Sequence, residues 1–170
     1  TNGENILIDN PIIVNTYGKA PQSGIDIEPN SNKDVIDQIE IKNPITIQNK
    51  KTGIIIALKQ LVGPLSKNVN IKILNHLDIS SALGFRIAGY NNKKPESNYK
   101  KLNGLILVQS PEWRDNKQYF ATENNQNLYP VLKIKSVTAK KKINNQLLID
   151  KEYPKRLQKG THRIGIIVEE

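Results

Sequence analysis

The stretch Val35-Ile36-Asp37-Gln38-Ile39-Glu40-Ile41-Lys42-Asn43-Pro44-Ile45-Thr46-Ile47-Gln48 decides the fold class of this chain. From Gln38 to Gln48, isoleucines occupy odd positions and polar side chains even ones, with Asn43-Pro44 as an interruption. Alternation with a period of two is typical of a β-strand with one buried and one wet face. Pro44 can enter such a strand only at an edge, a bulge or a start. We therefore predict extended structure on both sides of Asn43-Pro44.

The same alternation recurs along the chain, in residues 6–14, 69–73, 131–138 and 163–168. Residues 54–58 and 105–108 are apolar on both faces, which predicts central strands covered on both sides. Isoleucine and valine dominate the apolar residues, and their branched side chains favour strands over helices. Helical signals are limited to short turns near residues 80–83 and 97–102. The sequence therefore predicts an almost entirely β chain.

Clusters of Asn, Gly, Pro and Lys, such as Asn144-Asn145, separate the predicted strands, as turns do. Eight or nine strands at short spacing without helices between them favour an antiparallel, immunoglobulin-like β-sandwich. No internal repeat or domain boundary is visible, so residues 1–170 are expected to form one domain.

The composition excludes several kinds of chemistry. The 170 residues contain no cysteine, which rules out disulfides, a cysteine nucleophile and thiolate metal sites. The two histidines, His76 and His162, have no second ligand at metal-binding spacing. No arrangement of acid, base and nucleophile is visible, so we expect a protein that is not an enzyme and has no metal or cofactor. A small hydrolase with carboxylates such as Asp26 and Glu28 is a further alternative.

The net charge of +9 is unevenly distributed. Residues 1–85 hold eight lysines and eight acids, so the whole excess belongs to residues 86–170. This basic half can attract an acidic polymer, or it can be an ordinary solvated surface. Nucleic acid is not favoured, since lysine far outnumbers arginine and aromatic residues do not accompany the lysines. The candidate polyanion-binding residues are Lys133, Lys135, Lys140, Lys141 and Lys142.

The segment from Ser110 to Phe120 carries the only tryptophan. Trp113, with Arg114 and Tyr119, could contact a sugar or a protein partner, because an indole stacks on sugar rings and anchors interfaces. The alternative is that Trp113 packs in the interior, where most tryptophans are largely buried.

The two ends of the chain resemble those of bacterial fimbrial, pilin-type subunits. Residues 5–14 form an extended apolar strand after a short polar tail, and residues 157–168 run from a Gly160-Thr161 turn into an alternating last strand. The resemblance implies an immunoglobulin-like sandwich whose first strand is donated to a neighbouring subunit. It also implies four donor side chains, Ile6, Ile8, Ile12 and Val14. The alternative is an ordinary first strand that pairs within its own sheet.

Our leading hypothesis is a structural or adhesive subunit of the bacterial cell surface that binds other subunits by strand addition. The start at Thr1 without a signal peptide and the lack of cysteine are compatible with a mature secreted chain. The second hypothesis is a module that binds a host glycan or an acidic polymer through the basic half. No membrane-spanning segment is expected.

Overall fold

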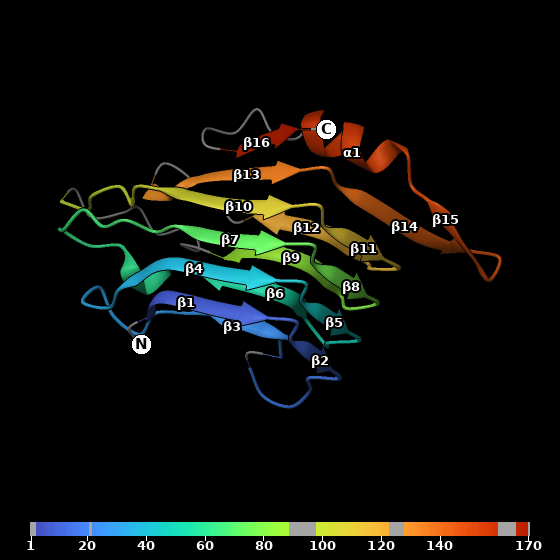
Figure 1. Cartoon of the computed structure of the whole chain (residues 1–170), viewed down its shortest axis with the longest axis horizontal. Coiled ribbons are helices and arrows are strands. Elements are labelled where there is room, and N and C mark those ends of the chain that lie inside the picture. Colours follow the sequence, from blue (N-terminus) through green and yellow to red (C-terminus); the bar gives the residue numbers. More distant parts are fainter. Residues whose placement is uncertain (1–2, 21, 89–97, 123–127, 160–165, 170) are drawn as a thin grey trace.

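The computed structural model describes residues 3–20, 22–88, 98–122, 128–159 and 166–169. The prediction of an almost entirely β chain is confirmed, with 53% strand and 6% helix. The strands wind into a β-solenoid of about four turns, in which each coil lies against the next (Figure 1). The prediction of an antiparallel immunoglobulin-like sandwich is therefore wrong.

Three sheets line the solenoid. Each of the first four coils contributes one strand to every sheet, and the described strands of the last coil belong to sheets A and B. Sheet A contains six parallel strands: β1 (Gly3–Asp9), β4 (Ile36–Lys42), β7 (Ile71–Leu74), β10 (Leu105–Gln109), β13 (Val131–Lys135) and β16 (Ile166–Glu169). Sheet C contains four: β3 (Ile25–Ile27), β6 (Thr52–Ala57), β9 (Leu83–Ala88) and β12 (Gln118–Thr122).

Sheet B has five parallel strands and a sixth that reverses: β2 (Ile12–Val14), β5 (Ile45–Ile47), β8 (Leu77–Ile79), β11 (Glu112–Arg114), β14 (Thr138–Ile143) and β15 (Gln146–Ile149). The pair β14–β15 is the single antiparallel pair in the described part of the chain. Asn144 and Asn145 join these two strands with φ of 48° and 63°, the left-handed geometry that favours Asn in a two-residue hairpin. The predicted turn at this position is confirmed.

Each two-residue interruption between strands is a corner of the solenoid. Equivalent residues of successive coils begin the corner between sheets A and B, all with φ between 49° and 56°: Asn10, Asn43, Asn75, Ser110 and Ser136. Asparagine adopts the left-handed conformation more readily than most residues. The corner turns the chain onto the next sheet without reversing it, so each strand meets its partner one coil later. Asn43-Pro44 therefore separates β4 from β5, and Asn10-Pro11 separates β1 from β2.

The corners also show the internal repeat that the sequence analysis did not find. Ile12 pairs with Ile45, Ile45 with Leu77, and Leu77 with Glu112. The sequence distances between these partners are unequal, and the residues at a corner vary between Asn and Ser. A repeat of variable length with such substitutions is hard to see in one sequence.

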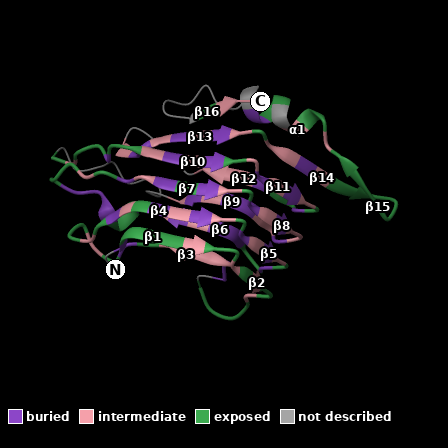
Figure 2. Ribbon diagram, in the orientation of Figure 1, coloured by how far each residue is buried: buried purple, intermediate pink, exposed green. Residues whose placement is uncertain are grey.

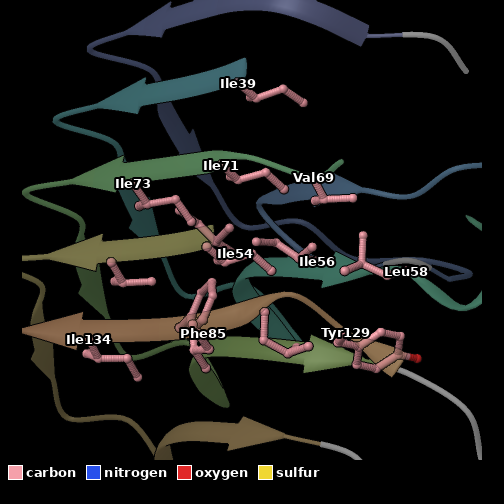
Figure 3. Packing of buried hydrophobic residues seen from close by; sticks show 14 of the residues in the cluster. Ile39, Ile54, Ile56, Leu58, Val69, Ile71, Ile73, Phe85, Tyr129 and Ile134 are labelled. Carbon is pink, nitrogen blue, oxygen red and sulfur yellow. The ribbon is translucent and has the colours of Figure 1, made fainter. Parts of the chain in front are cut away.

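The core lies between the three sheets, where inward side chains stack in columns from coil to coil. One column of sheet A runs through Ile39, Ile71 and Ile106, all buried. In Figure 3, Ile71 and Ile73 of sheet A point toward Ile54 and Phe85 of sheet C. The burial pattern follows the strands, with purple interior positions along every middle coil (Figure 2). The period-two pattern thus correctly indicated the inner face of β4, with Ile39 and Ile41 buried. In β5 the predicted faces are exchanged, because Thr46 is buried and the isoleucines beside it are half-buried.

Two helices are present in the described residues, η1 (Lys59–Leu61) and α1 (Glu152–Lys159). Neither was predicted, and no helix forms at residues 80–83 or in the described part of residues 97–102. In α1, the apolar residues Tyr153 and Leu157 are four positions apart and so share one helical face. The Asp150 carboxylate accepts hydrogen bonds from the backbone N–H groups of Glu152 and Tyr153, at 3.2 and 3.0 Å, as an N-terminal cap does.

Candidate functional site

The strands β1, β2 and β3 form the first coil, and we call their unpaired side the N-terminal edge. Each of them lies at the end of its sheet and pairs on one side only, with β4, β5 and β6 respectively. Ile6 is 37% exposed, whereas its column neighbour Ile39 is 6% exposed. The inner apolar columns therefore reach the surface at this edge.

The four predicted donor residues do not share one face. Ile6 and Ile8 lie beside the buried Ile39 and Ile41 and belong to the inner face of sheet A. The corner at Asn10-Pro11 then turns the chain, so that Ile12 and Val14 point outward from sheet B, 66% and 48% exposed. The expectation that all four lie in phase is wrong, because it treated two strands as one. In the structure β1 and β2 pair with strands of the same chain.

The first coil is acidic. Residues 3–28 contain four acids, Glu4, Asp9, Asp26 and Glu28, and one lysine. The Oδ1 atom of Asp26 is buried without a hydrogen-bond partner. Burial, with the nearby Glu28 carboxylate, raises the pKa of Asp26 to about 6. The N-terminal edge thus combines exposed aliphatic side chains with negative charge.

The five predicted polyanion-binding lysines lie on two different sheets. Lys133 and Lys135 are on β13 and both form ion pairs with Glu169, the second at 2.9 Å. These two lysines, Lys133 first, lower the pKa of Glu169. The corner at Ser136 separates them from the three lysines of β14. Much of the positive charge of Lys133 and Lys135 is therefore balanced by Glu169.

The lysines of β14 differ in their partners. Lys140 forms an ion pair with Glu112. Arg114 also contacts Glu112, at 2.6 Å, and Arg114 followed by Lys140 lowers the pKa of that carboxyl group. Lys141 and Lys142 are exposed, and their side chains have no ion pair among the described residues. These two are the lysines of the predicted set that remain available to a partner.

Trp113 lies in the interior and exposes no surface for a sugar ring. Its ring packs edge-on against Tyr153 of α1, which in turn contacts Tyr119 with ring centroids 4.6 Å apart. Tyr119 is also buried, and Arg114 is held by Glu112. Trp113, Arg114 and Tyr119 therefore form no common exposed platform. The alternative of an interior Trp113 agrees with the structure.

A chain of buried hydrogen bonds crosses the interior beneath sheet B. The Trp113 Nε1–H donates to His76 Nδ1 at 3.4 Å, which leaves His76 Nε2 to donate to Thr46 Oγ1 at 2.8 Å. The Thr46 hydroxyl then donates to Asp78 Oδ2 at 2.5 Å. All four side chains are fully buried. Since indole N–H is only a donor and carboxylate only an acceptor, one set of donor directions satisfies the whole chain.

Further donors converge on the same carboxylate. Ser81 donates to Asp78 through its hydroxyl at 2.8 Å and its backbone N–H at 3.2 Å, and Asn116 donates through Nδ2. Burial raises the pKa of Asp78, and the hydrogen bonds from Thr46, Asn116 and Ser81 oppose that shift. Burial lowers the pKa of His76 to about 3, so its imidazole is neutral at pH 7. The network is inaccessible to solvent and serves the packing of the coils.

Glycine is required beside this network. A Cβ atom on Gly53 would lie 2.1 Å from Asp78 Oδ2 and 2.6 Å from Thr46 Oγ1. Sequence analysis did not single out Thr46, Asp78, Ser81 or Asn116. The signal that could have found them is the coil repeat, because Thr46, Asp78 and Trp113 occupy one column of sheet B.

A groove of about 420 Å³ opens at the start of sheet A. It is lined by Asn5, Gln38, Ile39, Glu40, Asn70 and Lys72. Asn5 and Gln38 have φ of 55° and 52°, and their side-chain amides have no hydrogen-bond partner in the described structure. The lining offers amides and one charge of each sign, but no aromatic face and no nucleophile. This groove is adjacent to the N-terminal edge and is less distinctive than the edge itself.

The described residues show neither a metal-ion cluster nor a membrane-spanning helix. They contain no group of three or more His, Asp or Glu residues placed to hold a metal ion. Among them there is also no helix with the length and apolar character needed to cross a membrane. His162 and the Gly160-Thr161 turn lie outside the described residues. Comparison of the chain with protein-family models, curated proteins and solved structures finds no match.

Proposed function

We propose that this protein is a non-enzymatic structural subunit that assembles with other subunits by accepting a β-strand at its N-terminal edge. The observation that supports this function is the exposure of Ile6, whose column is buried in the coils that follow. The proposal keeps the predicted mode of assembly, strand addition, without the immunoglobulin-like fold. A location on the bacterial surface stays a prediction from composition.

The backbone of β1 supplies the attraction. Asn10 donates its N–H to Lys42 of β4, and N–H groups alternate in direction along a strand. The N–H groups of Leu7 and Asp9 therefore point away from β4, toward the open side. An exposed edge with unpaired N–H and C=O groups is a template for another strand.

The usual protection of such an edge is weak here. Natural sheets discourage pairing with lysine or proline on the edge strand. No lysine occurs in residues 3–14, and Pro11 lies in the corner between β1 and β2 rather than in either strand. The left-handed backbone at Asn5 is matched by that at Gln38 on β4 and affects only the beginning of β1. The second half of β1 is thus free to pair.

Substitution of Leu7 tests the proposal. The variant Leu7→Pro removes an outward N–H without disturbing the bonds to β4, since proline is tolerated on an edge. The matched control Leu7→Ala removes the same exposed side chain but keeps the N–H. Sedimentation velocity across a wide concentration range should show association of the wild type and of Leu7→Ala, and a monomer for Leu7→Pro. A wild type that stays monomeric, or a folded Leu7→Pro variant that associates equally well, would contradict the proposal.

A further inference from the structure

The two ends of the solenoid carry opposite charge. Residues 3–28 hold four acids and one lysine, whereas residues 138–159 hold seven basic residues and two acids. We propose that the strand accepted at the N-terminal edge is β16 of a second copy, so that copies join head to tail with sheet A running continuously through the contact. This inference rests on the proposed function and names its partner.

The register of sheet A allows this contact. β1 and β16 are the two edges of one parallel sheet, and Figure 1 places them at opposite ends of the stack of coils. The column that begins at Leu7 passes through Glu40, Lys72, Leu107 and Lys133 and ends at Ile167. Leu7 and Ile167 are 60% and 44% exposed. If β1 continues the register on β16, these two exposed aliphatic side chains cover each other.

The neighbouring columns are compatible with the same register. Ile8 would lie beside Val168, which already packs partly against the core. Asp9 would lie beside Glu169, whose negative charge is balanced by its ion pairs with Lys133 and Lys135. The contact therefore leaves no unbalanced like charges within sheet A.

The position of α1 supplies the opposite charge. In every earlier coil the chain passes through sheet C before it returns to sheet A, and in the last coil α1 takes that place between β15 and β16. Tyr153 of α1 packs on Tyr119 of β12, which confirms that the helix follows sheet C. The acidic β3 of the next copy would therefore lie over this helix. Asp26 and Glu28 would then face Lys155 and Arg156.

The alternative contact between two N-terminal edges is disfavoured. A two-fold axis would pair β1 with β1 in antiparallel fashion and bring two acidic coils together. Like charges brought together across an interface are unfavourable and discriminate against wrong partners. The exposed Lys155 and Arg156 have partners within their own chain, Glu152 at 3.1 Å and Asp150 at 2.6 Å. Exposed pairs of this kind are weak and can be exchanged for others.

A charge-exchange experiment tests the inference. One variant combines Asp26→Lys with Glu28→Lys, and the other combines Lys155→Glu with Arg156→Glu. Each alone would oppose like charges in a head-to-tail contact, so we expect association to weaken by about tenfold or more. An equimolar mixture should recover association, because each altered end then meets a complementary one. Sedimentation velocity measures the association, and circular dichroism confirms folding.

A matched control separates local from overall charge. Lys141→Glu with Lys142→Glu makes the same change in net charge on β14, away from the position of sheet C, and should weaken association much less. Equal weakening by this control, or failure of the mixture to recover, would overturn the head-to-tail contact. Loss of association in Leu7→Pro with no effect of either charge variant would keep strand addition but refute β16 as the partner. Association of Leu7→Pro would refute the proposed function itself.

Discussion

The first and last coils of this solenoid are built on the same strand pattern but are closed differently. In the last coil, α1 lies against β14 and β16 and places Tyr153 and Leu157 over the interior. In the first coil no described element covers β1, β2 and β3, and Ile6 is partly exposed. Stacked coils bury their inner faces only against neighbours, so the terminal coils need a cap. The difference is that α1 covers the interior at the last coil and leaves β16 as the edge of sheet A, whereas the first coil is open along all three of its strands.

The largest expected effect compares the interior of the stack with its open end. Ile71→Ala removes a fully buried side chain that has neighbours on both sides, and should lower the free energy of unfolding by about 2–5 kcal/mol. Ile6→Ala, in the same column, should cost about 1 kcal/mol because its site is partly exposed and contacts one coil only. Urea unfolding of the dilute monomer measures both. Equal losses would show that the N-terminal edge is as well covered as the interior.

The next effect compares the response of the interior to pH with that of the first coil. The pKa of His76 falls from 6.5 to about 3 on folding, so the unfolded state binds the proton more readily. The contribution of neutral His76 to the free energy of unfolding is complete above pH 6.5. It is lost as the pH falls toward 3, by about 1.4 kcal/mol per pH unit. His76→Gln, a neutral side chain that can still donate and accept, should therefore flatten the loss of stability between pH 6 and 4. Urea unfolding at several pH values tests this.

Asp26 in the first coil should act with the opposite sign. Its pKa is raised to about 6, so the folded state binds the proton more readily than the unfolded state. The stabilisation of the folded state by protonated Asp26 is therefore lost as the pH rises from about 4 to 6. Asp26→Asn should remove that trend without affecting the one due to His76. If both variants change the pH dependence in the same direction, the two regions are not electrostatically distinct.

The smallest effect concerns the side-chain hydrogen bonds that link asparagines at the same corner of successive coils, here called the corner ladder. Asn43 donates to Asn10 at 3.0 Å and accepts from Asn75 at 2.9 Å, whereas Asn10 lies at the open end with one such bond. Asn43→Ala should cost about 1–2 kcal/mol, and Asn10→Ala about 1 kcal/mol, since alanine disfavours left-handed φ and each exposed bond is weak. Asn43→Gly allows the left-handed φ but has no side chain, so the stability that it loses measures the side-chain hydrogen bonds alone. Thermal unfolding ranks the three variants, and an equally stable Asn43→Ala would show that the corner tolerates any residue.

The sequence analysis identified the strands better than their partners. The alternation at Ile39 and Ile41 shows which side chains of β4 face inward, because a strand places successive side chains on opposite faces. Past the corner the faces are exchanged, since Thr46 is buried and Ile45 and Ile47 are only half-buried. The same alternation occurs in parallel and antiparallel sheets. We interpreted Asn43-Pro44 as an interruption of one strand, although it is a corner. A local pattern of two residues contains no information about a partner more than 30 residues away.

The candidate sites show the same limit. The exposure of Lys141 and Lys142 agrees with a charged surface, but the balance of Lys133 and Lys135 by Glu169 depends on β16 lying beside β13. The hydrogen-bonded chain from Trp113 through His76 and Thr46 to Asp78 joins three coils and could not be predicted without the register. Tyr153 and Leu157, four residues apart, were the missed local signal for α1.

Local alternation and composition are enough to show that this chain is almost entirely β and that it has no cysteine chemistry. Three properties emerge only when the coils pair. The strands wind as a solenoid, Ile6 and Ile12 face different ways, and the acidic first coil and basic last coil lie at opposite ends, because pairing between coils is non-local. Left-handed corners set its direction, and no single strand encodes which neighbour it will meet.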